Sequence, residues 1–136
     1  MLDFDFSNSD MSSKVILNAE GLKEVLNDLD TSAEHLEITV DPDEELIRLS
    51  TSGVSGRLDI EIPKVSDLVS HFSSSKVINA KYPMNLFKHS LKPLSISEKV
   101  SVRINKRDIL CLQYMVRCEE HKSFLEFVCI PEEIES

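Results

Sequence analysis

The sequence predicts an α+β domain built from antiparallel sheets with two helices on one face. Two observations carry this prediction. Short runs in which apolar and polar residues alternate, the pattern of half-buried strands, are joined by connections too short for parallel crossovers. The order of a strand, a helix and three strands also occurs twice, at a spacing of roughly 62 residues, which is too long for a solenoid repeat and too short for two domains.

The first copy begins with a short apolar strand at residues 14–18 and continues into a helix. The buried face of that helix is defined by four apolar residues at helical spacing, Leu22, Val25, Leu26 and Leu29. Strands are expected at residues 36–40, 46–49 and 57–62, with a turn at Asp41-Pro42-Asp43 after the first of them. In the third strand we expect the alternate apolar residues to face the core, namely Leu58, Ile60 and Ile62. A brief helical turn is expected over Val65–Phe72.

The second copy begins at Lys76–Ala80, which echoes the start of the first copy at Lys14–Asn18. A helix is expected over residues 83–92, with Leu86, Phe87 and Leu91 on its apolar side. Strands follow at residues 100–104, 109–112 and 124–130. Because neither copy is large enough for a core of its own, we expect the two to share one core.

The composition of the chain limits the classes of function that it can have. A chain of 136 residues suits one globular domain, and its net charge of −9 argues against a surface that binds nucleic acid throughout. Any contact with DNA must therefore come from a local patch. No run approaches the roughly 18 apolar residues of a membrane span. The three cysteines, odd in number and without metal-ligand spacing, indicate reduced thiols in an intracellular protein, so we expect no metal and no cofactor.

Several segments resemble, in order and along nearly the whole chain, the C-terminal half of the Rad-one subunits of the DNA-damage checkpoint clamp. These segments are Leu2–Phe6, Glu20–Leu22, Arg48–Thr51, Lys99–Arg103, Leu112–Met115 and Phe127–Pro131. The resemblance implies a sliding-clamp domain, similar in shape to proliferating cell nuclear antigen, at residues 14–131. It also implies a remnant of an interdomain connector at residues 1–13, an acidic tail at residues 132–136, and the absence of a first clamp domain.

The same resemblance implies a non-enzymatic role. Such subunits form a heterotrimeric ring with two related subunits, Rad-nine and Hus-one. The ring encircles double-stranded DNA at damage sites in the nucleus and supports checkpoint signalling and repair, and a clamp loader is a further expected partner. Because the helices of a clamp line its channel, basic residues on their outer faces would meet phosphates without reading bases. The candidates are Lys88 and Lys92, which share a helix face, with His89 nearby and Lys23 on the more acidic first helix.

By position, the strand at residues 57–62 corresponds to the one that clamp subunits use to pair with a neighbour, so Arg57, Asp59 and Glu61 are candidate interface residues. The final strand would pair with the absent first domain and is expected to lie open in this chain. Leu2, Phe4 and Phe6 present alternate apolar side chains that either border a pocket for client peptides or pack on the domain itself.

Two alternatives belong to other classes. A 3′-5′ exodeoxyribonuclease, an activity suggested for this family, would need carboxylates converging on metal ions. The acids available, Asp3 and Asp5 or the set Asp41, Asp43, Glu44 and Glu45, are neighbours in sequence and do not predict such a site. The chain could also be a truncated regulatory form that competes for clamp partners.

Overall fold

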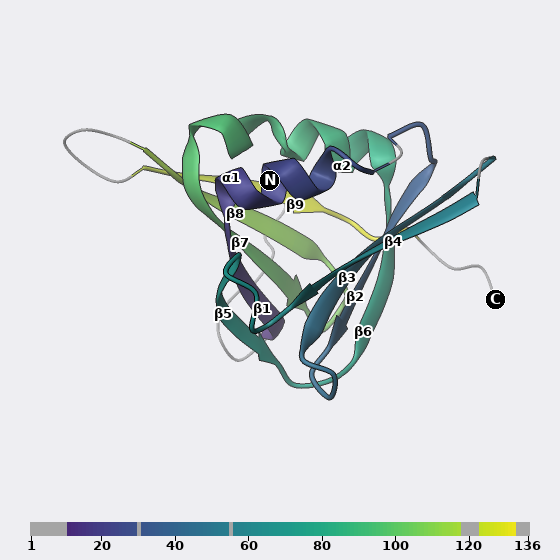
Figure 1. Cartoon of the computed structure of the whole chain (residues 1–136), viewed down its shortest axis with the longest axis horizontal. Coiled ribbons are helices and arrows are strands. Elements are labelled where there is room, and N and C mark those ends of the chain that lie inside the picture. The colour runs from purple at the N-terminus through teal and green to yellow at the C-terminus, as the bar shows by residue number, and fades with distance from the viewer. Residues whose placement is uncertain (1–10, 30, 55, 118–122, 133–136) are drawn as a thin grey trace.

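The computed structural model describes residues 11–29, 31–54, 56–117 and 123–132. Two antiparallel sheets diverge from a pair of helices, α1 (Ala19–Leu26) and α2 (Met84–Ser90), which lie on the same side of the molecule (Figure 1). A short 3₁₀ helix, η1 (Lys92–Ile96), follows α2. The predicted α+β class and the placement of both helices on one side are therefore confirmed.

Each sheet draws strands from both halves of the chain. The first sheet has the spatial order β5 (Val69–Ser74), β1 (Met11–Asn18), β7 (Ser97–Asn105), β8 (Leu110–Val116) and β9 (Ser123–Cys129). The second sheet has the order β4 (Gly56–Pro63), β3 (Leu46–Gly53), β2 (His35–Asp41) and β6 (Ile78–Pro83). All neighbouring strands pair antiparallel.

The topology confirms the internal repeat. The first copy runs β1, α1, β2, β3, β4 and the second runs β6, α2, β7, β8, β9. The first strand of each copy joins the sheet of the other copy, so β1 lies beside β7 and β6 lies beside β2. This exchange explains why two half-sized units share one core. It also makes β4 and β9 equivalent, since each is the last strand of its copy and each lies at the edge of its sheet.

The predicted helical turn over Val65–Phe72 is wrong beyond its first residues. Residues 64–68 form turns, and the chain then enters β5, which pairs with β1 so that Phe72 lies opposite Val15. A helical turn this short has little stability of its own, whereas β-branched and aromatic residues are favoured on a sheet. Pairing with β1 therefore decides the conformation.

Strand β1 begins three residues earlier than expected, at Met11. Ser12 and Ser13, which their composition assigned to a linker, are buried, and Ser13 lies opposite Ser74 of β5 and Ile104 of β7. Ser13 is paired on both sides, and the Ser12 carbonyl accepts from the Ser75 backbone N–H at 2.9 Å, so backbone bonds hold both serines in spite of their low strand propensity. The structural domain thus extends into the segment expected to be connector.

The core fills the space between the sheets and the helices. Its largest fully buried side chains come from both copies and include Leu17, Leu36, Ile38, Ile47, Tyr82, Met84, Ile104 and Tyr114. The two tyrosine hydroxyls are satisfied, since Tyr82 Oη donates to the Asp108 carbonyl at 2.7 Å and Tyr114 Oη donates to the Ser90 carbonyl at 2.5 Å. Burial raises the pKa of both phenols. These hydroxyls tie β6 to the β7–β8 turn and β8 to the end of α2.

The helices are too short to be stable alone, so packing must hold them in place. The Asn18 side chain caps α1 by accepting a hydrogen bond from the Gly21 backbone N–H at 2.8 Å. Leu22 and Leu26 of α1 and Phe87 of α2 are buried against the sheets. Within the described part of the chain, no helix is long and apolar enough to cross a membrane.

Candidate functional site

The four candidate DNA-facing residues all lie on the helical side of the molecule. Lys23 is exposed on α1, Lys88 and His89 are exposed on α2, and Lys92 is exposed at the start of η1. Exposed acids surround Lys23, namely Glu20 and Glu24 on α1 and Asp28 just after it. The positive charge of this side is therefore concentrated on α2 and η1, as the sequence indicated.

The apolar side of α2 differs from the prediction. Leu86 is 49% exposed, whereas Phe87 is buried and Leu91 is partly buried against the core. Met84, three residues before Phe87, occupies the inner face instead and is fully buried. Because successive helical residues are about 100° apart, Leu86 cannot share that face. Leu86 consequently lies exposed on the helix that carries Lys88.

The candidate subunit-interface residues lie on β4, an edge strand of its sheet. Among the described strands, β3 alone pairs with β4. Arg57, Asp59 and Glu61 are exposed, as predicted, and Ile62 is buried. Ile60 packs against the core, but Leu58 is 37% exposed, so the predicted burial of Leu58 is wrong. Leu58 lies opposite Thr51 near the hairpin end, two residues beyond Ile60, and does not pack against the core cluster.

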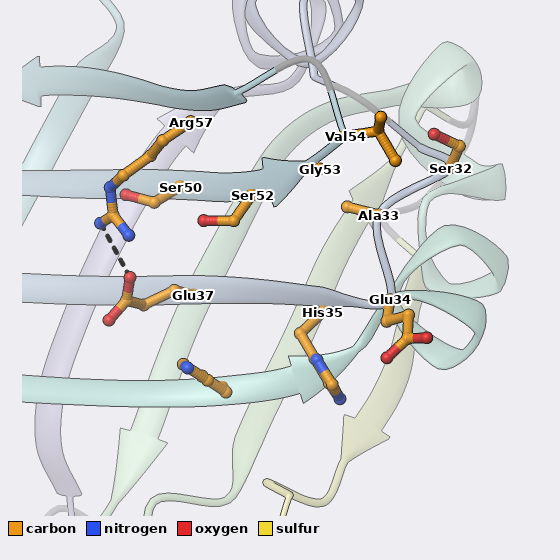
Figure 2. Close-up of a pocket in the computed structure, with 11 residues that line it drawn as sticks. Ser32, Ala33, Glu34, His35, Glu37, Ser50, Ser52, Gly53, Val54 and Arg57 are labelled. Carbon is orange, nitrogen blue, oxygen red and sulfur yellow. Dashed lines mark hydrogen bonds and ion pairs between the residues drawn. The ribbon is translucent and has the colours of Figure 1, made fainter.

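The exposed side chains of β4 are satisfied within their own sheet. Glu61 accepts from Arg48 on β3 at 2.5 Å, and Asp59 accepts from the Ser50 hydroxyl at 2.5 Å. Figure 2 shows Arg57 reaching across β3 to Glu37 on β2, where its Nη2 donates at 2.9 Å. These partners could not be predicted from the sequence, because cross-strand pairs depend on a register that only the fold defines.

This network shifts the pKa values of its members. The Ser50 hydroxyl bond and the charge of Arg57 hold the pKa of Asp59 below its usual value, and the Asn79 amide and Arg57 do the same for Glu37. Glu37 in turn raises the pKa of Arg57. Since lowered carboxyl pKa values favour the folded state above the unfolded pKa, this contribution is present at neutral pH and is lost as the pH falls.

The backbone edge of β4 is what remains available to a partner. Gly53 and Gly56 pair across the two-residue connection of the β3–β4 hairpin, and Gly56 has a φ of 126°, which favours glycine. In such a hairpin, hydrogen-bonded and non-hydrogen-bonded pairs alternate from the turn outward. Arg57, Asp59 and Glu61 fall in the non-bonded pairs, so their N–H groups point away from β3 toward the open edge.

A pocket of about 400 Å³ lies beside this hairpin on the outer face of the second sheet. The segment Ser32–His35 and the hairpin end, Gly53 and Val54, flank it, and Glu37, Ser50 and Arg57 lie across its floor (Figure 2). Its main cation and anion, Arg57 and Glu37, are already paired with each other. His35 on its rim pairs with Glu132 at 2.7 Å, and Glu34 and Lys81 complete its charged lining.

Strand β9 is the matching edge of the first sheet, because among the described strands β8 alone pairs with it. Phe127 packs inward, with its ring centroid 6.2 Å from that of Tyr114. Phe124 and Val128 are exposed on the outer row together with Glu126. The prediction that the final strand offers an apolar edge thus agrees with the structure.

The residues weighed for other chemistry are dispersed. Asp41 closes the β2–β3 turn by accepting from the Asp43 and Glu44 backbone N–H groups, and no group of three or more His, Cys, Asp or Glu side chains converges among the described residues. Cys111 and Cys129 are buried free thiols, and burial raises the pKa of Cys111 to about 11. Five other residues that the sequence singled out for a pocket or a metal site lie outside the described residues, namely Leu2, Asp3, Phe4, Asp5 and Phe6.

Comparison with known proteins decides the family. Residues 1–116 match the family described as repair protein Rad1/Rec1/Rad17. The chain belongs to this family. The Rad1 family relatives include the cell cycle checkpoint protein RAD1 of Mus musculus, 44% identical over 97% of this chain, and that of Homo sapiens, 42% identical over 97%. The DNA damage checkpoint control protein rad1 of Schizosaccharomyces pombe is 26% identical over 96% of this chain.

The match is to one part of longer proteins. The chain spans 48% of the mouse relative, 47% of the human one and 41% of the fission yeast one, or about half their length. The two-sheet fold with paired helices is the clamp domain expected for the Rad1 family, and the duplicated topology of the structure agrees with it.

Proposed function

We propose that this chain is a ring-building domain of a DNA-damage checkpoint clamp and acts without catalysis of its own. The observation that carries the proposal is the open backbone edge of β4, whose side chains are already paired within the sheet. Such an edge is suited to strand addition by a neighbour. The names of the mammalian relatives, which are cell cycle checkpoint proteins, support the same role.

The proposed partners follow from that role. Two related subunits of the Rad-nine and Hus-one types would complete a heterotrimeric ring, loaded by a clamp loader around double-stranded DNA in the nucleus. Residues 14–131, together with the start of β1 at Met11, would form the clamp domain, the residues before Met11 would belong to a connector, and residues 132–136 would form an acidic tail. Strand β9 would continue its sheet into a first clamp domain. Residues Leu2, Phe4 and Phe6 would border the pocket for client peptides.

The helical side would face the DNA. Lys88 and His89 on α2 and Lys92 on η1 provide the local positive charge that an acidic chain needs for phosphate contact. Lys23, among its acidic neighbours, would contribute less. Encirclement by a ring, with weak contacts to phosphates, requires neither base readout nor high affinity.

Reversing two of these charges tests the assignment. We expect Lys88→Glu with Lys92→Glu to weaken the association of the assembled ring with DNA. The plot of log affinity against log salt concentration should also become less steep by about two, because each phosphate contact contributes about 0.9 to the slope. Measurement of DNA binding by the ring over a range of salt concentrations gives both values. Thermal stability should change little, since exposed charges contribute little to folding.

A matched control reverses two exposed cations away from the helices. Lys76→Glu with Lys106→Glu changes the net charge by the same amount and should leave the salt slope unchanged. If both double variants lose the same affinity, the effect comes from overall charge and the helical side has no special role. If neither changes DNA binding, the DNA-facing assignment of Lys88 and Lys92 is wrong.

A further inference from the structure

The outer face of the first sheet carries a groove that the clamp role does not use. Its volume is about 130 Å³, and its lining comes from four strands. Ser101 of β7 lies at its centre, opposite Ile16 of β1 and Gln113 of β8. Lys99 and Arg103 lie two residues to either side of Ser101 on the same face of β7. The groove thus has a small polar floor with one cation at each end.

The two cations have no carboxylate partner among the described residues. Arg103 is held against the sheet by bonds to neutral groups, donating from Nε to the Ser101 hydroxyl at 3.1 Å and from Nη2 to Gln113 Oε1 at 2.9 Å. The Lys99 ammonium has no hydrogen bond or ion pair with the part of the chain that the structure describes. Lys14 lies directly opposite Arg103 on β1 and adds a third cation. In a chain with a net charge of −9, this face is locally basic.

One side of the groove is apolar and open. Phe124 of β9 is 56% exposed, and it lies opposite Met115 of β8, which is itself opposite Lys99. Ile16 borders the groove from β1 and is only partly buried. Glu126 of β9 neighbours the groove, and Gln113 Nε2 donates to its carboxylate at 3.0 Å. The apolar side chains therefore surround a site that is basic at its ends.

We propose that this groove binds an extended peptide with the order acid, any residue, aromatic, any residue, acid. Residues four apart on a strand are about 13 Å apart, so Lys99 and Arg103 are spaced like the first and fifth residues of an extended peptide. In that conformation alternate side chains share one face. Both acids and the aromatic ring would then face the groove together, with the ring over Ser101 between Ile16 and Met115.

The spacing makes the proposal selective. A peptide in which acids and aromatic residues alternate directly, as Asp3, Phe4 and Asp5 do in this chain, would present its acids and its ring on opposite faces when extended. Such a peptide can pair with the cations or fill the groove, but it cannot do both. The occupant is therefore expected to be a segment of another protein with the wider spacing.

Fluorescence anisotropy of labelled peptides on the full chain tests this binding. The probe is Gly-Ser-Glu-Ser-Phe-Ser-Glu-Ser-Gly, and the matched control is Gly-Ser-Ser-Glu-Phe-Glu-Ser-Ser-Gly, which has the same composition. We expect the probe to bind at least about tenfold more tightly than the control, and Lys99→Glu with Arg103→Glu to remove that difference. Lys64→Glu with Lys81→Glu, on the second sheet and its edge turn, should leave it intact.

Three results would overturn the proposal. Equal affinity of the two peptides would show attraction by charge alone. If Lys99→Glu with Arg103→Glu and Lys64→Glu with Lys81→Glu weaken probe binding equally, the probe does not bind at the groove. If Asp3→Ser with Asp5→Ser makes the full chain bind the probe about tenfold more tightly, the start of this chain competes for the groove, and the occupant is not a partner. Unchanged thermal melting of each variant shows that the comparison is between folded chains.

Discussion

Introducing Asp59→Pro on β4 should impair assembly with a neighbouring clamp subunit far more than it impairs folding. The alternation of pairs from the β3–β4 hairpin directs the Asp59 N–H toward the open edge, so proline removes a donor that β3 does not use. An incoming strand would lose that hydrogen bond and would meet the proline ring in its place. We expect affinity for the neighbour, measured by surface plasmon resonance, to fall about tenfold or more, or about 1.4 kcal/mol.

Two controls separate backbone from side-chain effects. Asp59→Ala removes the same bonds to Ser50 and Arg57 but keeps the N–H, so it should assemble normally if the backbone edge carries the interface. Ile60→Pro removes a donor that faces β3 and should lower thermal stability more than Asp59→Pro does. Normal recovery of the complex with Asp59→Pro, or equal losses for Asp59→Pro and Asp59→Ala, would count against pairing through the edge.

The purified chain is expected to associate with itself at micromolar concentration through β9. The outer row of that strand exposes Phe124 and Val128, and Glu126 is its only charged side chain. An apolar edge with so little charge is a template for strand addition. Strand β4, whose outer row carries Arg57, Asp59 and Glu61, is better protected. Strand β6 is partly covered, since the Glu132 N–H donates to the Lys81 carbonyl at 2.8 Å.

Val128→Lys should reduce this association, because it places a cation on the outer row of β9 beside Glu126. Sedimentation equilibrium of the two chains over the same concentration range gives the comparison. Val65→Lys, at a 91% exposed position in the turn after β4, adds the same charge away from β9 and should not change the association. A monomer throughout the range for the unmodified chain would show that the β9 edge is covered.

Much of the fold could be predicted because its strongest signals are local. Alternating apolar and polar residues predicted β2 and β4, and apolar residues at helical spacing predicted α1. The similarity of Lys76–Ala80 to Lys14–Asn18 predicted two equivalent halves of the chain. Strand β5 could not be predicted, since its short apolar spacing fits a helical turn equally well and only pairing with β1 decides. The exposure of Leu86 likewise follows from where α2 rests on the sheets, which no local pattern specifies.

The candidate site was predicted only in part, for a related reason. The resemblance implied that residues 57–62 form an interface strand, and alternation indicated that Arg57, Asp59 and Glu61 face outward. Their partners Glu37, Ser50 and Arg48 depend on the register of three strands. The groove around Ser101 depends on four strands, and its lining residues are scattered along the chain from Ile16 to Phe124. Sites made by a sheet face become visible only when the strand order is known.

Hydrogen–deuterium exchange of the chain, with and without the two related clamp subunits, tests the proposed role most directly. If β4 is the edge that a neighbour extends, the amide protons of Arg57, Asp59 and Glu61 should exchange markedly more slowly in the assembly, because their N–H groups become hydrogen-bonded across the interface. Amides of α1 and α2 should be unchanged in the absence of DNA. Assembly that leaves exchange in β4 unchanged and protects another surface would contradict the account.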